Sequence, residues 1–203
     1  MRFPTKVFDT LWHVGTLDAS DKRHGSLEGA GLSVSQHPDE WERIARLGGN
    51  SVWELCRLGA CFVDAYAMSD EQWSVVLAWG TEQGLCRRGT GWRVSWWDDD
   101  LDDDVSFMFA SFDAASNEVS EGTTEPIEVK AWLPTARLQE VSMWATLPDL
   151  VCVRDLVLAD WAAREPRFAG VWWDDLLAPD LLSAPRGVIP KEQLGSWSVT
   201  RLR

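Results

Sequence analysis

The sequence lacks the short motifs that mark several common kinds of enzyme site. Its four cysteines form no Cys-x-x-Cys pair, and no two of its three histidines are four residues apart. Zinc fingers and helical His-x-x-x-His zinc sites are therefore not expected, and we predict no metal site. The Gly-x-Ser-x-Gly elbow of many serine hydrolases is missing, and so are the glycine-rich phosphate loops of P-loop and Rossmann proteins.

Long apolar runs are also missing. No stretch approaches the ~20 apolar residues that a membrane-spanning helix needs. Residues 1–6 lack the apolar stretch of a signal peptide, so we expect a cytoplasmic protein with no membrane partner. The cysteines stand among apolar neighbours, which favours reduced thiols buried in the core: Cys56, Cys61, Cys86 and Cys152.

Positive charge is scarce. The chain has 19 Lys and Arg against 32 Asp and Glu, which gives a formal net charge of -13. Such a protein does not adhere passively to nucleic acid or anionic lipid, so nucleic acid is expected only as a substrate. Segment 98–104 is strongly acidic, and Asp103 stands where an EF-hand needs its turn glycine. A solvated loop is therefore favoured over a calcium site.

The composition indicates one folded domain of mixed structure. The chain has 203 residues, of which 45% are hydrophobic and 25% charged, so we predict a single domain over residues 1–203. Strand-like and helix-like segments interleave irregularly, which favours an α+β fold over a doubly wound parallel sheet. Fourteen tryptophans are spread from Trp12 to Trp197, which favours packing roles over a single binding platform.

Local patterns predict most of the elements. Apolar patterning predicts strands at 7–14, 31–35, 90–97, 105–112, 127–133 and 169–173, and a turn at 183–190 that feeds a last strand. Helices are predicted to begin at His37-Pro38, at Ser69 with Gln72 closing a capping box, and near Leu147. Segment 51–66 fits either a strand or a helix, and segments 18–29 and 113–124 are predicted to be loops.

Two short motifs carry the main functional hypothesis. Residues 13–16, His-Val-Gly-Thr, end the first predicted strand, and residues 31–35, Gly-Leu-Ser-Val-Ser, precede the predicted helix at Pro38. This arrangement resembles the ADP-ribosyltransferase superfamily, in which a strand ending in His-Gly-Thr or a variant is followed by a glycine-rich strand and a helix. Three later segments are similar to the middle strand, the penultimate strand and the final strand of that family: 128–134, 170–175 and 186–194.

The resemblance implies a split antiparallel β-sheet core with flanking helices and a cleft that binds NAD as a substrate. In this family the histidine and its neighbours hold the ribose and the nicotinamide, and hydroxyl groups of the second strand line the same cleft. Arg186, or the pair Lys22-Arg23, would hold phosphate, the arginine through a bidentate contact. The NAD-binding residues implied in this way are His13, Gly15, Thr16, Gly31, Leu32, Ser33, Ser35 and Arg186.

The sequence departs from the family at two places. Family members carry a glutamate at the start of the last strand, where it stabilises the cationic sugar that forms as the nicotinamide bond breaks. Here that place falls near Pro185-Arg186, and serine stands where the family often has a tyrosine. We therefore predict Glu128 or Asp174 as the catalytic carboxylate beside His13. If neither carboxylate reaches the cleft, the protein binds NAD or a nucleotide without transferring ADP-ribose.

These residues also have structural interpretations. His13 suits a capped or core histidine, Ser33 and Ser35 suit the solvent face of a strand, and Arg186 suits an arginine that anchors a turn.

Three functions fit the sequence. The first is an NAD-dependent ADP-ribosyltransferase-like enzyme, a toxin or phage-defence effector that transfers ADP-ribose to a macromolecule. The second is an acidic, non-enzymatic interaction protein such as an immunity protein, an antitoxin or a nucleic-acid mimic, which the net charge and segment 98–104 favour. The third is a domain with no small-molecule site.

Overall fold

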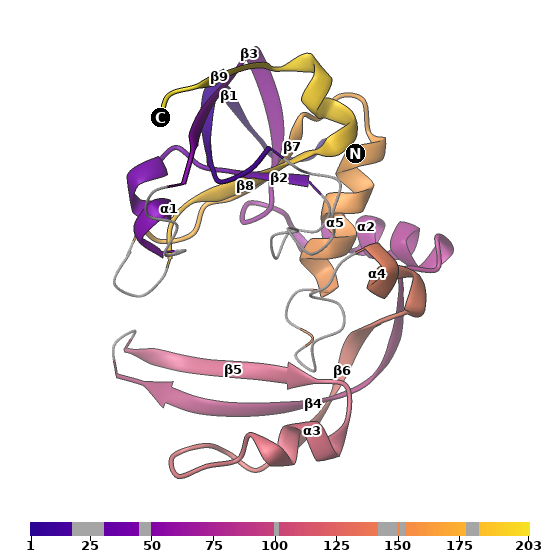
Figure 1. Cartoon of the computed structure of the whole chain (residues 1–203). Helices are drawn as coiled ribbons and strands as arrows, with labels where there is room; N and C mark the ends of the chain where they lie inside the picture. The colour runs from indigo at the N-terminus through magenta and orange to yellow at the C-terminus, as the bar shows by residue number, and fades with distance from the viewer. Residues whose placement is uncertain (18–30, 45–49, 100–101, 142–149, 151–152, 178–182) are drawn as a thin grey trace.

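The computed structural model describes residues 1–17, 31–44, 50–99, 102–141, 150, 153–177 and 183–203. In this part of the chain, strands and helices interleave in a mixed α+β architecture, which confirms the predicted class (Figure 1). The strands are β1 (Thr5–Val14), β2 (Gly31–Val34), β3 (Val52–Asp64), β4 (Cys86–Asp98), β5 (Asp103–Phe109), β6 (Ile127–Pro134), β7 (Gly170–Trp173), β8 (Arg186–Pro190) and β9 (Ser198–Arg201). The helices are α1 (Pro38–Ile44), α2 (Asp70–Glu82), α3 (Phe112–Asn117), α4 (Ala136–Val141), α5 (Val153–Arg164) and the 3-10 helix η4 (Lys191–Ser196).

The first sheet has six strands and bends back on itself. Its order is β1-β3-β7-β8-β2, and β9 pairs with the beginning of β3. An antiparallel bridge between Trp12 and Ser35 joins the end of β2 to β1, so the path of strand pairing returns to its first strand. The pairing of β3 with β7 is parallel, whereas the other named pairings are antiparallel. The sheet is therefore mixed, not purely antiparallel as the resemblance implied.

A core of large side chains fills this curved sheet. Phe62, Trp172 and Leu11 are almost completely buried there. The ring of Phe62 packs edge-on against Phe8, and the ring of Trp172 packs tilted against it. Burying one such side chain contributes roughly 1.5–3 kcal/mol, so this cluster is a main source of the stability of the sheet. Gly170 permits the close packing, because a methyl group there would meet the carbonyl of Val188 and the ring of Phe62.

The second sheet has three strands in the order β5-β4-β6, with both pairings antiparallel. It lies on the far side of α2, α4 and α5 from most of the first sheet, as Figure 1 shows. The largest buried cluster takes side chains from both sheets and from α2 and α5, among them Val171, Leu133, Val76 and Val157. Helices α2 and α5 approach closely at Gly80, where a methyl group would lie 2.5 Å from Val157.

Most predicted elements are present, with three corrections. The ambiguous segment 51–66 is the strand β3, and the predicted capping box of Ser69 and Gln72 is confirmed at the start of α2. The predicted loop 113–124 contains most of α3, which Ser111 caps. The turn predicted at 183–190 is mostly the strand β8, and the last described strand is β9. The helix predicted from 147 is described only from Val153.

Several smaller expectations have mixed outcomes. Cys86 is buried as predicted, but Cys56 and Cys61 are only half-buried, and Cys152 lies outside the described residues. Burial raises the pKa of the Cys86 thiol, with a weaker opposing effect from Thr81. The loop predicted at 18–29, with its Lys22-Arg23 pair, also lies outside the described residues. No helix in the described part of the chain has both the length and the apolar character needed to cross a bilayer.

Candidate functional site

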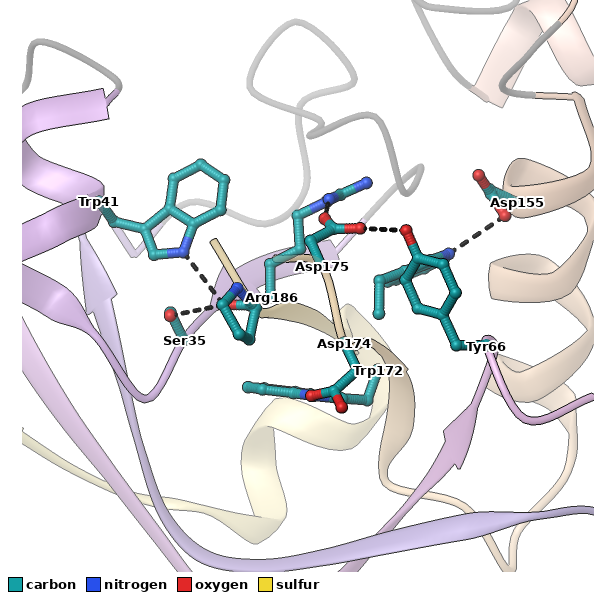
Figure 2. Close-up of polar contacts among 10 residues, drawn as sticks. Ser35, Trp41, Tyr66, Asp155, Trp172, Asp174, Asp175 and Arg186 are labelled. Carbon is teal, nitrogen blue, oxygen red and sulfur yellow. Dashed lines mark hydrogen bonds and ion pairs between the residues drawn. The ribbon is translucent and has the colours of Figure 1, made fainter. Parts of the chain in front are cut away.

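One hydrogen bond joins the second motif, residues 31–35, to the residue that precedes segment 186–194. The Ser35 hydroxyl, just past the end of β2, donates to the carbonyl oxygen of Pro185, just before β8, at 2.7 Å (Figure 2). The indole nitrogen of Trp41 donates to the same oxygen at 3.3 Å, and the backbone N–H of His37 donates to the Ser35 hydroxyl at 3.0 Å. Ser35 is 3% exposed, so its hydroxyl does not lie on a solvent face.

An ionic group stands directly beside this junction. Arg186 forms an ion pair with Asp175, which lies two residues past the end of β7, and both side chains are largely buried. The Tyr66 hydroxyl, just past the end of β3, donates to Asp175 at 2.6 Å. We call Ser35, Tyr66, Asp175, Pro185 and Arg186 the Arg186 cluster. Its members come from the ends of β2, β3 and β7 and from the beginning of β8, which are neighbours in the first sheet.

A cavity adjoins the cluster on the side of α5. It has a volume of about 320 Å³, and its lining includes Tyr66, Trp173, Asp155 and Arg154. The Trp173 indole donates to Asp155 at 3.1 Å, and the Arg186 guanidinium carbon lies 5.7 Å from the centre of a Trp173 ring. Because an arginine over an aromatic face is held by the ring electrons, Trp173 helps to fix Arg186 in place.

His13 is anchored at the end of β1 through both ring nitrogens. Nδ1 lies 2.7 Å from the carbonyl oxygen of Ser33, and Nε2 lies 2.7 Å from the carbonyl oxygen of Thr16. Burial lowers the pKa of His13, and the two carbonyls, which favour the protonated ring, offset part of that effect. The ring therefore ties β1 to β2 and to the turn that follows β1.

Gly15 and Thr16 form that turn. The φ angle of Gly15 is 129°, which a residue with a side chain rarely adopts. Its N–H donates to the Ser51 carbonyl at 2.8 Å, and its own carbonyl accepts from the Trp53 indole at 2.9 Å. The Thr16 side chain is exposed, so its hydroxyl is accessible to solvent.

The remaining residues of the second motif serve packing in the described structure. Leu32 is 2% exposed and belongs to the core of the first sheet. Gly31 faces β8 so closely that a methyl group would lie 2.5 Å from Val188 and 2.7 Å from the Ile189 carbonyl. Ser33 is half-buried, and its carbonyl holds His13.

The three residues predicted as catalytic lie in three different places. Glu128 is exposed on β6 in the second sheet, where the Thr90 hydroxyl donates to it at 3.5 Å. Asp174 bonds to Lys6 at 2.6 Å, and this contact lowers the pKa of Asp174. Lys6 and His13 stand seven positions apart on β1, roughly 23 Å of strand length, so the structure does not bring Asp174 and His13 together.

Sequence reasoning missed Asp175, Tyr66 and Trp41. Neighbouring residues of an extended segment point to opposite sides, so Asp174 turns to Lys6 while Asp175 turns to Arg186. The repeated Asp-Asp after Trp172-Trp173 was the available signal, but the sequence alone does not decide which carboxylate faces β8. Tyr66 is the single tyrosine of the chain, which is a second signal.

Comparison with known proteins gives no match. No family model fits the chain, and no curated protein or solved structure is significantly similar to it.

Proposed function

We propose that this chain is an ADP-ribosyltransferase-like enzyme that binds NAD at the Arg186 cluster and transfers ADP-ribose to a macromolecule, as a toxin or a phage-defence effector would. The observation that carries the proposal is the hydrogen bond from Ser35 to Pro185. It joins the second motif to the beginning of β8, the strand that resembles the family's final strand.

The neighbourhood of the first motif supports the same site. His13 bonds to the Ser33 carbonyl, and Trp12 pairs with Ser35, so β1, β2 and β8 follow one another around the sheet. The resemblance requires these three strands to surround one cleft. In this proposal His13 positions β2 and the turn at Gly15, because its two ring nitrogens lie at hydrogen-bonding distance from the backbone carbonyls of Ser33 and Thr16.

The donor set fits a dinucleotide that carries a diphosphate. Arg186 offers a planar fork of N–H groups suited to phosphate oxygens, and the Tyr66 hydroxyl, which donates to Asp175, holds that carboxylate beside it. A diphosphate beside Arg186 would compete with Asp175 for the guanidinium. Asp175 would then stand free, within reach of Tyr66, as the carboxylate that the family's missing glutamate would supply.

The chemistry assigned to Asp175 is electrostatic. When the bond between C1′ of the ribose and the nicotinamide nitrogen breaks, the electron pair leaves with nicotinamide and the sugar becomes cationic. A carboxylate held nearby stabilises that charge until the acceptor attacks C1′ and loses a proton. Removing one such group costs about 10²–10³ in rate in other enzymes, which sets the size of the expected effect.

Nicotinamide release from NAD tests this function. We expect the wild-type protein to release nicotinamide and Asp175→Asn to lose about 10²-fold in rate. Asp160→Asn is the matched control, because it also removes a carboxylate that pairs with an arginine, Arg164, but lies on α5. An equal loss of rate in both variants would contradict the role of Asp175. If the release of nicotinamide depends on Asp174 or Glu128 instead, that residue is the catalytic carboxylate.

The second candidate function is docking to a basic protein partner. One observation favours it, because four exposed aspartates lie in the acidic turn between β4 and β5 and at the start of β5: Asp99, Asp102, Asp103 and Asp104. Converting them to asparagine would abolish capture of a basic partner and leave nicotinamide release unchanged. If the wild-type protein releases no nicotinamide and the acidic turn alone governs a stable complex, this second function replaces the first.

A further inference from the structure

A second and larger cavity lies between α2, the second sheet and the beginning of α5. Its volume is about 560 Å³, within the range of about 300–1,000 Å³ that small-molecule sites occupy. We call it the cationic pocket, after three of its lining residues. The polar and aromatic residues that matter most here are Asp70, Trp73, Arg88, Lys130, Trp132 and Arg154.

Positive charge is concentrated in this pocket against the trend of the whole chain. The chain carries 32 acidic and 19 basic residues, yet the pocket is lined by Arg88, Lys130 and Arg154 against the single carboxylate of Asp70. None of the three cations forms an ion pair with a described residue. Three like charges around one cavity repel one another, and an anion between them removes that cost.

Two of the cations are held in place by aromatic rings. The Arg88 guanidinium carbon lies 4.7 Å from the centre of a Trp132 ring, and the Arg154 guanidinium carbon lies 4.2 Å from the centre of a Trp73 ring. Stacking fixes the plane of a guanidinium and leaves its N–H edge free for a bidentate contact. Pre-organised forks of this kind suit phosphate oxygens, because less side-chain entropy is lost when they bind.

The pattern of strands explains how the charges converge. Arg88 and Trp132 are directly opposite each other in the β4–β6 pairing, and Lys130 stands two positions from Trp132, so the three side chains share one face of the sheet. Trp73 and Leu77 stand four positions apart on α2 and face the same cavity. Leu77, together with Met108 and Leu150, adds apolar lining beside the charges.

We propose that the cationic pocket binds a nucleoside phosphate. Three cations call for a ligand with at least two negative charges, and phosphate supplies them in the geometry that two arginine forks accept. The apolar lining from α2 and the second sheet suits the base or the sugar of the same ligand. The ligand is either a free nucleotide or the phosphorylated end of a nucleic-acid strand, since both carry this chemistry.

The cationic pocket is distinct from the Arg186 cluster but close to it. Trp73 and Arg154 line both the cationic pocket and the smaller cavity that reaches Tyr66. A nucleotide bound in the pocket would therefore lie one cavity away from Asp175. The inference stands on the pocket alone and goes beyond the proposed NAD site.

Calorimetric titration with ADP, which carries no nicotinamide, tests the pocket. We expect saturable binding that weakens at least about tenfold in Arg88→Gln and in Arg154→Gln, because each loses a charged hydrogen-bonding partner of phosphate. Arg87→Gln is the matched control. It makes the same change one residue away, on the opposite face of β4, at a residue that does not line the pocket.

Three further titrations identify the source of the phosphate and distinguish this site from the proposed NAD site. A 5′-phosphorylated oligonucleotide that binds through Arg88 more tightly than ADP, while its unphosphorylated form does not bind, would assign a nucleic-acid end. ADP binding that survives Ser35→Ala supports a separate site. Binding lost in Ser35→Ala and retained in Arg88→Gln would overturn the proposal, as would no heat with ADP or either oligonucleotide at millimolar concentration.

Discussion

The hydroxyl of Ser35 and the carbonyl of Pro185, separated by 150 residues, are joined by a partly buried hydrogen bond of 2.7 Å. The bond fixes the end of β2 against the beginning of β8, where Arg186 turns toward Asp175. Two further donors bond to the same pair of atoms, because the Ser35 hydroxyl accepts from the backbone N–H of His37 and the Pro185 carbonyl accepts from the indole nitrogen of Trp41. A single side chain thus organises the edge of the sheet on which the proposed site is built.

Ser35→Ala is expected to destabilise the fold by about 1–3 kcal/mol, because the Pro185 carbonyl and the His37 N–H each lose a hydrogen-bond partner in a partly buried place. Urea denaturation measures the change. Ser33→Ala is the matched control on the same strand, since no hydrogen bond of its hydroxyl is found among the described residues. Equal effects of the two variants would mean that the Ser35 hydroxyl contributes nothing specific.

The ion pair of Arg186 and Asp175 predicts energetic coupling between the two residues. Both side chains are largely shielded from water, so a double-mutant cycle with Asp175→Asn and Arg186→Met should give a coupling free energy of about 1–2 kcal/mol. The same cycle on Arg164 and Asp160, whose side chains are more exposed, should give about 0.5 kcal/mol or less. A coupling free energy of zero between Arg186 and Asp175 would contradict the structure of the cluster.

Gly170→Ala should be among the most destabilising small substitutions in the chain. The added methyl group would lie 2.7 Å from the Phe62 ring and against the Val188 carbonyl, so β7 or β8 must move. Overpacking of this kind costs about 3 kcal/mol, which would be seen as a lower midpoint of thermal unfolding. Gly195→Ala, where no atom lies within 4 Å of the added methyl group, should leave the midpoint almost unchanged.

The stability of the fold should depend on His13 near neutral pH. Because burial lowers the pKa of His13, the unfolded chain binds its proton more readily than the folded one. The neutral ring therefore contributes fully to the free energy of unfolding above its unfolded-state pKa of about 6.5. This contribution is lost as the pH falls toward the lower pKa of the folded state. Urea midpoints should fall between about pH 7.5 and pH 5.5, and the fall should be smaller in His13→Gln than in His37→Gln. A steeper fall in His13→Gln would show that the ring binds its proton more tightly in the folded state.

The sequence was most informative where local chemistry decides the structure. The Ser69 capping box and the alternating residues of β2 involve partners within a few positions, so the start of α2 and the strand β2 followed directly. Segment 51–66 was ambiguous because β3 is bordered by β1 along its length and by β9 and β7 at its two ends. Val63 belongs to the largest buried cluster and its neighbour Phe62 to the core of the first sheet, so apolar residues lie on both faces of β3 and the period-two pattern is blurred.

The site was less predictable because it depends on contacts between distant segments. Asp175 is defined by Tyr66 and Arg186, which come from other strands, and its neighbour Asp174 has the same side chain but a different partner. The cationic pocket likewise combines α2, α5 and the second sheet, and nothing local to Arg88 or Arg154 predicts that they share a cavity. The scarcity of basic residues in the sequence also concealed the fact that three of them converge there.

Binding of NAD to the purified protein, measured by calorimetry beside His13→Ala, tests the central claim most directly. The proposal predicts saturable binding in the micromolar range, about −8 kcal/mol at 1 μM, and its loss in the variant, because His13 holds β2 and the Gly15 turn in position. Arg88→Gln should keep this binding, since Arg88 lies in the cationic pocket. No heat and no thermal shift at millimolar NAD would contradict the account, and binding abolished only by Arg88→Gln would place the dinucleotide in the cationic pocket instead.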